Sequence, residues 1–355
     1  MSARAALVAH CPPEPPWSGE RRRVAATLRH LDDRMGCDLV LCPPAQGAAA
    51  QLRRKLAEPL APPTARIVRP PAAALDRYDL VWVFELWAMS AVPARLRPSV
   101  VWDKDSLLYE LYDRDSPAGR LKAAWSRRWE LHWLRHAALG LLASADDVRR
   151  LGIDGVHHLP NGFEPPSEAP QRLPRSGEEL VLGFVGDLGF VPNQRGLELL
   201  LDEVLPELAG PARVLVVGRA DGLPAGLRAR LDAAPSVTML GYAERLEDFY
   251  AGIDVLLATM PEGIGTPTKV IEGLGHGVPV AGTAVSGRDL PPDLQPFYGV
   301  GRPGGWRAAV AAARESGTEP ARLRAAVEGA SWERRFAAAL DPLLEPLLKS
   351  RRRRP

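Results

Sequence analysis

The sequence predicts an α/β protein made of two Rossmann-like, doubly wound domains that face each other across a cleft. Short apolar runs alternate with helical stretches along almost the whole chain, which is typical of βαβ units and parallel sheets. A polar, Pro-rich stretch at 161–178 separates two such series and reads as an interdomain linker. The 355 residues are enough to bury two cores.

In the first half, the apolar run 5–9 predicts a strand and residues 18–34 predict the helix after it. Further strands are predicted at 38–42, 79–84, 99–103 and 139–143. A long helix is predicted at 119–136, where Trp125, Trp129 and Trp133 recur every four residues among several basic side chains. This stripe favours core packing, with the basic residues in water, over a helix that touches a membrane.

The second half is more regular. Strands are predicted at 180–185, 213–217, 237–240, 254–258 and 278–282, and helices are predicted to begin near residues 193, 224, 244 and 266. Ser331 is expected to cap a last helix, which Pro342 and Pro346 are expected to break or kink. The predicted division is an N-terminal domain at 1–160, the linker at 161–178, a C-terminal domain at 179–330, and a segment at 331–355. That last segment is expected to cross back to the first domain and to end in a basic tail.

Composition limits the function classes. With 45 basic and 43 acidic residues, the net charge of +2 predicts no broad nucleic-acid surface. Three cysteines are too few and too poorly spaced for a disulfide framework or a zinc site. Prolines interrupt the N-terminal apolar stretch, and no run reaches the length of a membrane span, so we expect a cytoplasmic protein without a signal peptide. The many Ala, Arg, Leu and Pro residues indicate a GC-rich, bacterial source.

The loop after the strand at 254–258 predicts an anion site. Gly263 and Gly265 permit a sharp turn and close approach of a ligand, and Thr266 is a plausible helix N-cap. Lys269 lies in the first helical turn, where the helix dipole disfavours a cation unless an anion is also held there. Glu272 lies on the same side and has oxygens suited to sugar hydroxyls. A diphosphate joined to a ribose fits these groups; a strand-to-helix loop with a solvated Lys and Glu fits the spacing equally well.

Two more strand-to-helix loops have similar properties. The stretch 186–196 follows the first strand of the second half, and its Arg195 can reach a phosphate. Ser18 and Gly19 open the first helix and offer free backbone amides to a polar ligand. None of these three loops contains the dinucleotide fingerprint or the Walker pattern, so the loops do not indicate a redox enzyme or a P-loop protein.

A family resemblance covers nearly the whole chain and is strongest at 159–285. In order, Phe184-Val-Gly-Asp-Leu188, Pro192-Asn193, Val216-Val-Gly218, Leu240-Gly-Tyr242 and 263–283 resemble the donor half of a GT-B glycosyltransferase of family 4. The phrase Leu159-Pro-Asn-Gly-Phe-Glu164 resembles that family's domain boundary. Pro12-Pro13 with Ser18-Gly19 resembles its N-terminal glycine loop, on the acceptor side.

The resemblance implies a nucleotide-sugar in the second domain, an acceptor in the first, retention of anomeric configuration, and no metal or other cofactor. Lys269 and Arg195 would neutralise the diphosphate, Glu272 would hold the ribose, and Gly265 would offer its amide to the phosphate or sugar. The other residues that the resemblance places around the donor are Gly186, Gly218, Gly241, Tyr242, Glu262, Gly263, Ile264 and Thr266.

Three departures from the family pattern bear on activity. Family members often carry a glutamate eight residues before Glu272, where this chain has Ile264; Glu262 is a substitute two residues earlier. Asp187 stands just after the first-strand glycine of the second domain, where family members often carry an arginine. No histidine stands at the end of the middle strand of the first domain.

Glu85 occupies roughly that histidine's place, and Asp103 and Asp105 end the next strand. With Lys269, these three carboxylates are the catalytic candidates, because a carboxylate can take the acceptor's proton or steady positive charge at the sugar. For each carboxylate the alternative is a structural role, capping a helix or pairing with an arginine.

The sequence thus predicts a retaining, hexosyltransferase-type enzyme that moves a sugar from a nucleotide diphosphate to a hydroxyl or amine. A natural product such as an antibiotic, or a surface glycan, is the expected acceptor. The alternatives are a GT-B nucleotide-sugar epimerase and an inactive homologue that binds a nucleotide or stabilises a partner. We expect no nucleic-acid partner. Peripheral contact with a membrane is an alternative that we do not favour.

Overall fold

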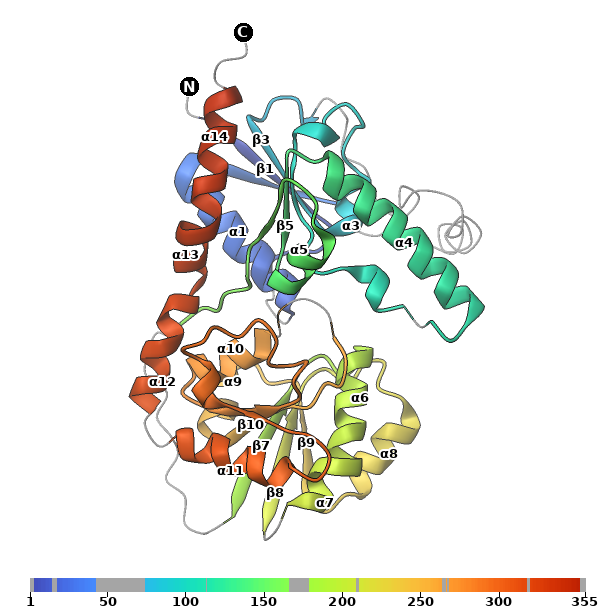
Figure 1. Ribbon diagram of the computed structural model, residues 1–355, viewed down its shortest axis with the longest axis vertical. Helices are drawn as coiled ribbons and strands as arrows, with labels where there is room; N and C mark the ends of the chain where they lie inside the picture. The colour runs from blue at the N-terminus through green and yellow to red at the C-terminus, as the bar shows by residue number, and fades with distance from the viewer. Residues whose placement is uncertain are drawn as a thin grey trace. The chain divides into compact units, whose positions relative to one another are not determined.

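The computed structural model describes residues 3–14, 18–42, 74–112, 114–165, 179–208, 211–263, 266, 268–317 and 320–351. The chain divides into two compact units (Figure 1). Unit 1 comprises Met1–Asn161 together with Trp332–Pro355, and unit 2 comprises Gly162–Ser331. The C-terminal segment is therefore grouped with the N-terminal part of the chain.

Unit 1 contains a six-stranded, fully parallel sheet in the order β2-β1-β3-β4-β5-β6. The strands are β1 (Ala5–Ala9), β2 (Cys37–Leu41), β3 (Leu80–Phe84), β4 (Val101–Asp103), β5 (Leu139–Leu142) and β6 (Val156–His158). The central strands β1 and β3 are buried along their whole length, as both faces of a parallel sheet are covered by helices. Because these strands run parallel, their carboxyl ends lie at the same edge of the sheet.

The helices of unit 1 cover both faces of this sheet (Figure 1). They are α1 (Gly19–Met35), α3 (Glu85–Met89), α4 (Pro117–His136), α5 (Ala145–Leu151), α13 (Trp332–Arg335) and α14 (Asp341–Arg351), with 3₁₀ turns at Arg97–Ser99 and Leu108–Glu110. Side chains alternate along β1, so Leu7 faces α1 and the C-terminal helices while Val8 faces the core under α3 and α4. The C-terminal segment thus completes one of the two cores of unit 1.

Unit 2 contains a second six-stranded parallel sheet, in the order β12-β11-β10-β7-β8-β9. The strands are β7 (Leu180–Val185), β8 (Ala212–Val217), β9 (Val237–Gly241), β10 (Val255–Ala258), β11 (Val280–Gly282) and β12 (Tyr298–Val300). The chain starts in the middle, runs to the β9 edge, returns to β10 beside β7 and continues outward. This doubly wound order has its switch point between β7 and β10, where such folds bind ligands beyond the strand ends.

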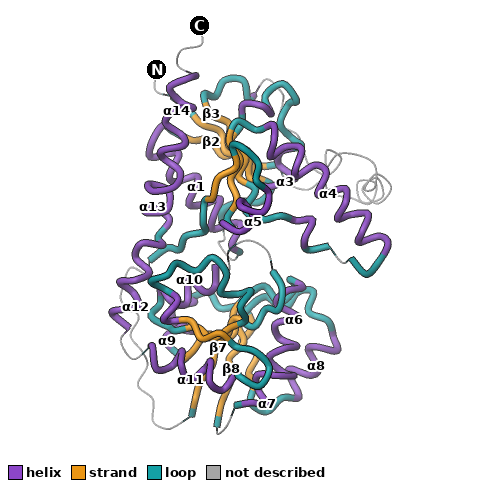
Figure 2. Tube along the Cα trace, in the orientation of Figure 1, coloured by secondary structure: helices purple, strands orange, loops and turns teal. Residues whose placement is uncertain are grey.

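The helices of unit 2 also lie on both faces, as Figure 2 shows. They are α6 (Val191–Leu199), α7 (Leu205–Glu207), α8 (Ala225–Ala233), α9 (Leu246–Ala251), α10 (Thr268–Gly275), α11 (Trp306–Ser316) and α12 (Pro320–Val327), with 3₁₀ turns at Gln295–Phe297 and Glu328–Ala330. Helices α6, α8 and α11 share one core, whereas α9, α10 and α12 share the other.

The predicted fold class is confirmed, and the differences are local. Strands β6 and β12 were not predicted, because each is a three-residue edge strand with little apolar pattern. Helix α10 begins at Thr268, two residues after the predicted start. A break or kink was predicted at Pro342 and Pro346; α14 continues through Pro346 without a break, after a π-helical segment at Phe336–Leu340. A second such segment, Leu200–Val204, follows α6.

The tryptophan stripe of α4 packs largely as expected. Trp125 and Trp133 are buried against α3 and the sheet, and Trp129 is partly buried. Across the described residues, no helix combines the length and the apolar character needed to cross a bilayer.

Candidate functional site

The carboxyl edge of the unit 2 sheet is built from backbone in close contact. Gly218 follows β8 with φ +155°, and a Cβ there would collide with the carbonyl oxygen of Gly186, which follows β7. The Gly218 amide donates to the carbonyl of Gly241 at the end of β9, where φ is +74°. Only glycine satisfies such an approach without strain. These contacts hold together the loops that follow β7, β8 and β9, and we call the surface formed by Gly186, Gly218 and Gly241 the glycine floor.

Asn193 connects this floor to the cation that the sequence singled out. Its side chain, from the first turn of α6, is buried and lies directly over Gly186, where a Cβ would leave no room for it. Its Nδ2 donates to the carbonyl of Asp187 at 2.7 Å, and its Oδ1 accepts from Lys269 Nζ at 2.6 Å. Asn193 was not among the candidate site residues; its place in the Pro-Asn pair after the Gly186 loop was the available signal.

Lys269 lies in the first turn of α10 and is held without a carboxylate. Its Nζ is 4.9 Å from the ring centroid of Phe184, and among the described residues no carboxylate oxygen lies within ion-pair distance. Burial lowers the pKa of Lys269 to about 7, although the nearby Glu272 carboxylate acts in the opposite direction. A lysine at a helix N-terminus with no carboxylate at ion-pair distance is suited to bind an anion there.

Arg195 is engaged differently from the prediction. Its guanidinium forms a salt bridge with Glu262 at 2.5 Å, and both side chains are about half exposed. The pair ties α6 to the loop that follows β10. Glu262 engages one nitrogen of the guanidinium, so a phosphate would either exchange with this carboxylate or bind the other N–H groups of Arg195.

The remaining donor-side candidates surround the same edge. Tyr242 is exposed after β9, Thr266 is buried just before α10, and Glu272 is half-buried one turn after Lys269. Gly263 has open space around its Cα, its nearest neighbour being the Arg288 side chain. Ile264 and Gly265 lie outside the described residues.

The carboxyl edge of the unit 1 sheet carries the other candidates. Ser18 caps α1 by accepting a hydrogen bond from the Arg21 amide at 3.3 Å, and Gly19 is the first helical residue. The predicted helix start is thus confirmed. The cap places the free amides of the first helical turn at this edge.

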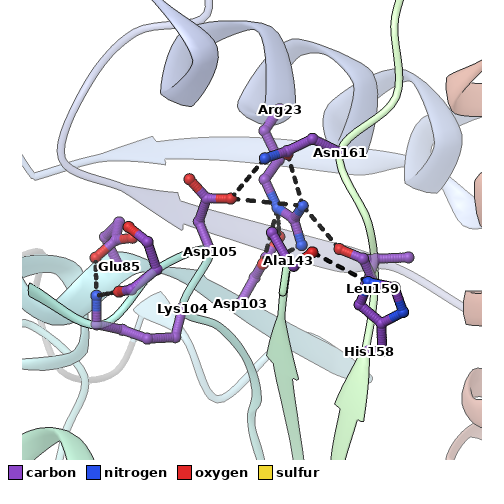
Figure 3. A network of polar contacts seen from close by, with 10 residues as sticks. Arg23, Glu85, Asp103, Lys104, Asp105, Ala143, His158, Leu159 and Asn161 are labelled. Atoms are coloured by element: carbon purple, nitrogen blue, oxygen red, sulfur yellow. Dashed lines mark hydrogen bonds and ion pairs between the residues drawn. The ribbon is translucent and has the colours of Figure 1, made fainter. Parts of the chain in front are cut away.

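Asp103 is enclosed and fully engaged by Arg23 of α1 (Figure 3). The guanidinium donates to Asp103 from Nε at 2.9 Å and from its terminal nitrogen at 2.7 Å, and neither side chain has exposed surface. Arg23 also donates to the carbonyl of Leu159 and to Asn161 Oδ1 at 2.8 Å. Of the two readings of Asp103, this geometry fits the structural one, in which the carboxylate pairs with an arginine.

Glu85 forms a second enclosed network with Lys104 (Figure 3). Lys104 Nζ donates to Glu85 Oε2 at 2.6 Å and also to the carbonyl of Ser106, and it lies 3.8 Å from Glu130 of α4. One lysine thus serves two buried carboxyl groups. Burial, reinforced by the neighbouring Glu20 and Asp105 carboxylates, raises the pKa of Glu85 well above its ordinary value.

Glu85 and Asp105 are also strained. Their φ angles are +69° and +48°, a region that costs a residue with a side chain on the order of 1–3 kcal/mol and that concentrates at functional sites. Asp105 accepts from Asn161 Nδ2 at 2.9 Å, and its side chain is 15% exposed. Burial raises the pKa of Asp105 too. Of the three candidate carboxylates, Glu85 and Asp105 combine strain with a raised pKa, which makes them the better proton carriers.

One group of side chains at this edge has metal-ligand chemistry. His10, Cys11 and Glu20 bring their ligand atoms within 4.8 Å of one another. Burial and the Glu20 carboxylate raise the pKa of Cys11 to about 12, so the thiol stays protonated at neutral pH. A cation bound here would have to displace the Cys11 proton, since a thiolate is the ligand form.

Part of unit 2 is similar to known proteins. Residues 179–300 match the model of the family described as Glycosyl transferases group 1. The matched stretch contains Gly186, Asn193, Arg195 and Lys269. Part of the chain is also similar to part of the lipopolysaccharide core biosynthesis mannosyltransferase LpsB of Rhizobium meliloti (strain 1021). The two are 29% identical over 136 residues, which cover 35% of this chain and 37% of the relative. The aligned stretch thus spans little more than a third of that curated relative.

Solved structures resemble the whole chain. Sucrose-phosphate synthase from Thermosynechococcus elongatus has a TM-score of 0.63 at 16% identity, with 99% of this chain and 97% of that chain covered. HepE from Anabaena, solved in complex with UDP and glucose, has a TM-score of 0.65 at 14% identity, with 99% and 100% covered. WaaG, a glycosyltransferase involved in lipopolysaccharide biosynthesis, has a TM-score of 0.53 at 15% identity, with 98% of each chain covered. The fold of this chain is the two-domain GT-B fold.

Proposed function

We propose that this chain, whose second unit carries the group 1 glycosyltransferase domain within a GT-B fold, is a retaining glycosyltransferase. It would move a hexose from a nucleotide-diphosphate sugar to a hydroxyl or amine of an acceptor. Unit 2 would bind the donor at the edge that carries Lys269, and unit 1 would contribute acceptor-side groups at the edge that carries Glu85.

One observation carries the proposal. The partly buried Lys269 lies at a helix N-terminus and is held by Asn193 beside the glycine-rich loops, with no carboxylate oxygen of the described residues at ion-pair distance from its Nζ. An anion with several oxygens completes this arrangement, and a diphosphate satisfies both the ammonium and free backbone amides.

The reaction follows from the charges involved. As the bond between the sugar C1 and the diphosphate oxygen breaks, negative charge develops on the leaving diphosphate, and a fixed cation stabilises it. The acceptor oxygen or nitrogen forms the new bond to C1 and loses a proton, which Glu85 or Asp105 would take. The proposal assigns charge neutralisation to Lys269, aided by Arg195 once Arg195 leaves Glu262, and so includes no metal.

The relatives suggest which donors to test first. HepE is described in complex with UDP and glucose, and LpsB is named a mannosyltransferase, so UDP-glucose and nucleotide-linked mannose head the panel. The acceptor would be a natural product or a surface glycan.

Turnover of a panel of UDP-, GDP- and dTDP-sugars, with and without candidate acceptors, tests the proposal. Free nucleotide released only when an acceptor is present supports transfer. Conversion of the sugar to an isomer without acceptor supports an epimerase instead, and binding without turnover supports an inactive nucleotide-binding homologue.

We expect donor affinity to depend on pH through Lys269. Burial lowers its pKa to about 7 in the free protein, whereas a bound diphosphate favours the protonated form. Binding should therefore take up a proton above pH 7, and affinity should fall by up to about tenfold per pH unit as pH rises from 7. Titration calorimetry in buffers of different ionisation enthalpy measures this uptake; proton-neutral binding at pH 8 would contradict it.

We expect Glu85→Gln to separate catalysis from stability. Glutamine can still accept the Lys104 hydrogen bond but cannot take a proton, so turnover should fall roughly a hundredfold or more. The raised pKa means that the native state keeps a proton that the unfolded chain releases, so wild-type stability declines as pH rises from 4.5 through the raised pKa, above which Glu85 is ionised and can take a proton. Glutamine removes this decline, and the variant should unfold at equal or higher urea concentration at neutral pH. Wild-type turnover in the variant would exclude Glu85 as the proton acceptor.

A further inference from the structure

The end of β1 and the start of α1 bring together three side chains that the proposed transfer reaction does not use. His10 and Cys11 directly follow β1, and Glu20 is the second residue of α1. An imidazole nitrogen, a sulfur and a carboxylate oxygen from these residues all lie within 4.8 Å of one another. The cysteine spacing alone predicted no zinc site, but the fold adds a histidine and a glutamate to one cysteine.

The three ligand atoms are close enough to share one small cation. In a tetrahedral zinc site, bonds of about 2.0–2.3 Å place neighbouring ligand atoms roughly 3.3–3.8 Å apart. His10 Nε2 and Glu20 Oε2 already lie 3.6 Å apart. From the 4.8 Å limit on the other separations, an inward movement of about 1 Å completes the geometry, and side-chain rotation supplies such a movement.

The imidazole of His10 is held by stacking and keeps its nitrogens available. Its ring lies parallel to that of Phe84, with an interplanar angle of 5° and 6.2 Å between centroids. Among the described residues its buried Nδ1 has no hydrogen-bond partner, and the 3.6 Å between Nε2 and Glu20 exceeds a hydrogen bond. An unpaired buried nitrogen is rare in folded proteins, and a metal ion is one group that pairs with it.

The charges at this place favour a divalent cation. Cys11 as a thiolate and Glu20 as a carboxylate supply two negative charges, so their complex with neutral His10 and a divalent ion carries no net charge. The N-terminal end of α1 disfavours a bare cation but favours these two anionic ligands. Nitrogen and sulfur ligands select zinc and related transition metals, whereas magnesium and calcium take oxygen ligands.

Solvent reaches the three side chains. Those of His10 and Cys11 are half-buried, that of Glu20 is partly exposed, and the Cys11 thiol is free. Three protein ligands leave the fourth tetrahedral position to a water molecule. A metal ion can therefore enter from solution without the fold having to open.

We propose that His10, Cys11 and Glu20 form a zinc-binding site that fastens the end of β1 to the start of α1. The imidazole nitrogen, the sulfur and a carboxylate oxygen coordinate the ion, and the Cys11 proton passes to the solvent as the sulfur binds. Because the folded strand and helix position the ligands, zinc stabilises unit 1. This inference does not depend on the proposed transfer reaction, in which Lys269 neutralises the diphosphate.

Titrations of the full, metal-free chain with Co²⁺ and Zn²⁺ test the proposal. Co²⁺ is the spectroscopic probe, because a thiolate bound to cobalt adds a charge-transfer absorption that nitrogen and oxygen ligands do not add. We expect this absorption, its loss when excess Zn²⁺ is added, and unfolding at higher urea concentration with Zn²⁺ than without. Cys11→Ser should remove the absorption, and both Cys11→Ser and Glu20→Gln should weaken Zn²⁺ binding about a hundredfold or more.

Two control variants make the result specific. Burial also raises the pKa of the half-buried Cys37 thiol to about 12, but within the described ranges Cys37 belongs to no cluster of three such ligands. Cys37→Ser should therefore keep the cobalt absorption. The double variant His132→Gln, His136→Gln removes two exposed imidazoles one turn apart on α4 and should keep it too.

A labelling experiment tests the wild type without any variant. Zn²⁺ should slow the reaction of Cys11 with a maleimide, followed by peptide mass spectrometry, and should leave the reaction of Cys37 unchanged. Circular dichroism melts show that each variant used in the titrations is folded.

Three outcomes would overturn the proposal. The first is a folded wild type that shows no thiolate absorption with Co²⁺ and no protection of Cys11 by Zn²⁺. The second is an absorption that persists in Cys11→Ser. The third is Zn²⁺ binding that the double variant of His132 and His136 abolishes and Cys11→Ser leaves unchanged, which would place the metal on α4 instead.

Discussion

Lys269→Ala is expected to lower turnover of the nucleotide-sugar by at least about a hundredfold while the chain stays folded. The variant removes the cation that would stabilise the leaving diphosphate. It does not create an unpaired buried charge, because the side chain that holds Lys269 is the neutral amide of Asn193. Asn193 also keeps its hydrogen bond to the Asp187 carbonyl. Lys269 in the charged form is itself costly, as its lowered pKa shows. The melting temperature should therefore remain close to that of the wild type.

Steady-state kinetics and a thermal melt check this expectation together. Lys349→Ala is the matched control, since Lys349 is exposed on α14 and pairs with Glu345. The control should turn over donor at the wild-type rate. If Lys269→Ala does the same, the diphosphate assignment is wrong.

Asp103→Asn is expected to destabilise unit 1 by about 3 kcal/mol, which is the largest effect on folding that we predict. The substitution keeps the shape of the side chain but leaves the Arg23 guanidinium, which has no exposed surface, without its bidentate partner. The neighbouring Asp105, 3.7 Å away, compensates only in part. Urea unfolding measures the loss as a lower midpoint with an unchanged slope.

The double variant Arg23→Met, Asp103→Leu provides the control. Replacing both charges by apolar groups of similar size removes the burial cost, so the double variant should recover most of the stability. If Asp103→Asn instead unfolds like the wild type and loses turnover, Asp103 is a catalytic residue and the structural reading fails.

The parallel sheets were predictable because their central strands are buried on both faces. Continuous apolar runs such as Ala5–Ala9 and Leu180–Val185 coincide with β1 and β7 at the predicted bounds. The edge strands β6 and β12 were not predictable, because a short edge strand is defined by its neighbour and not by its own side chains. Pro346 was expected to break or kink the last helix, yet it lies at an exposed position inside α14, which is continuous from Asp341 to Arg351.

Candidate site residues could be predicted only where a local backbone feature, such as a tight turn or a helix start, requires a particular residue type. Glycines after strands and a lysine in a first helical turn are local signals, and they made Gly186 and Lys269 candidates; Gly218 became a candidate only through the family resemblance. The contact of Lys269 with Asn193 joins residues 76 positions apart, so no local pattern reveals it.

The contacts of the candidate residues in unit 1 were unpredictable for the same reason, namely that the partners are far apart in the sequence. Arg23 lies on the buried side of α1, yet its partners Asp103 and Asn161 are 80 and 138 positions away. The sequence could place carboxylates at the ends of strands, but it could not say which of them an arginine would occupy.

Calorimetric titration of UDP, GDP and dTDP into the wild-type chain and into Lys269→Ala tests the central claim most directly, because it needs neither the sugar nor the acceptor. The donor-site assignment predicts that at least one diphosphate binds the wild type, that the matching nucleoside without phosphates binds far more weakly, and that Lys269→Ala abolishes the binding. Diphosphate binding of equal strength in Lys269→Ala, or no binding of any of the three to the folded wild type, would contradict it.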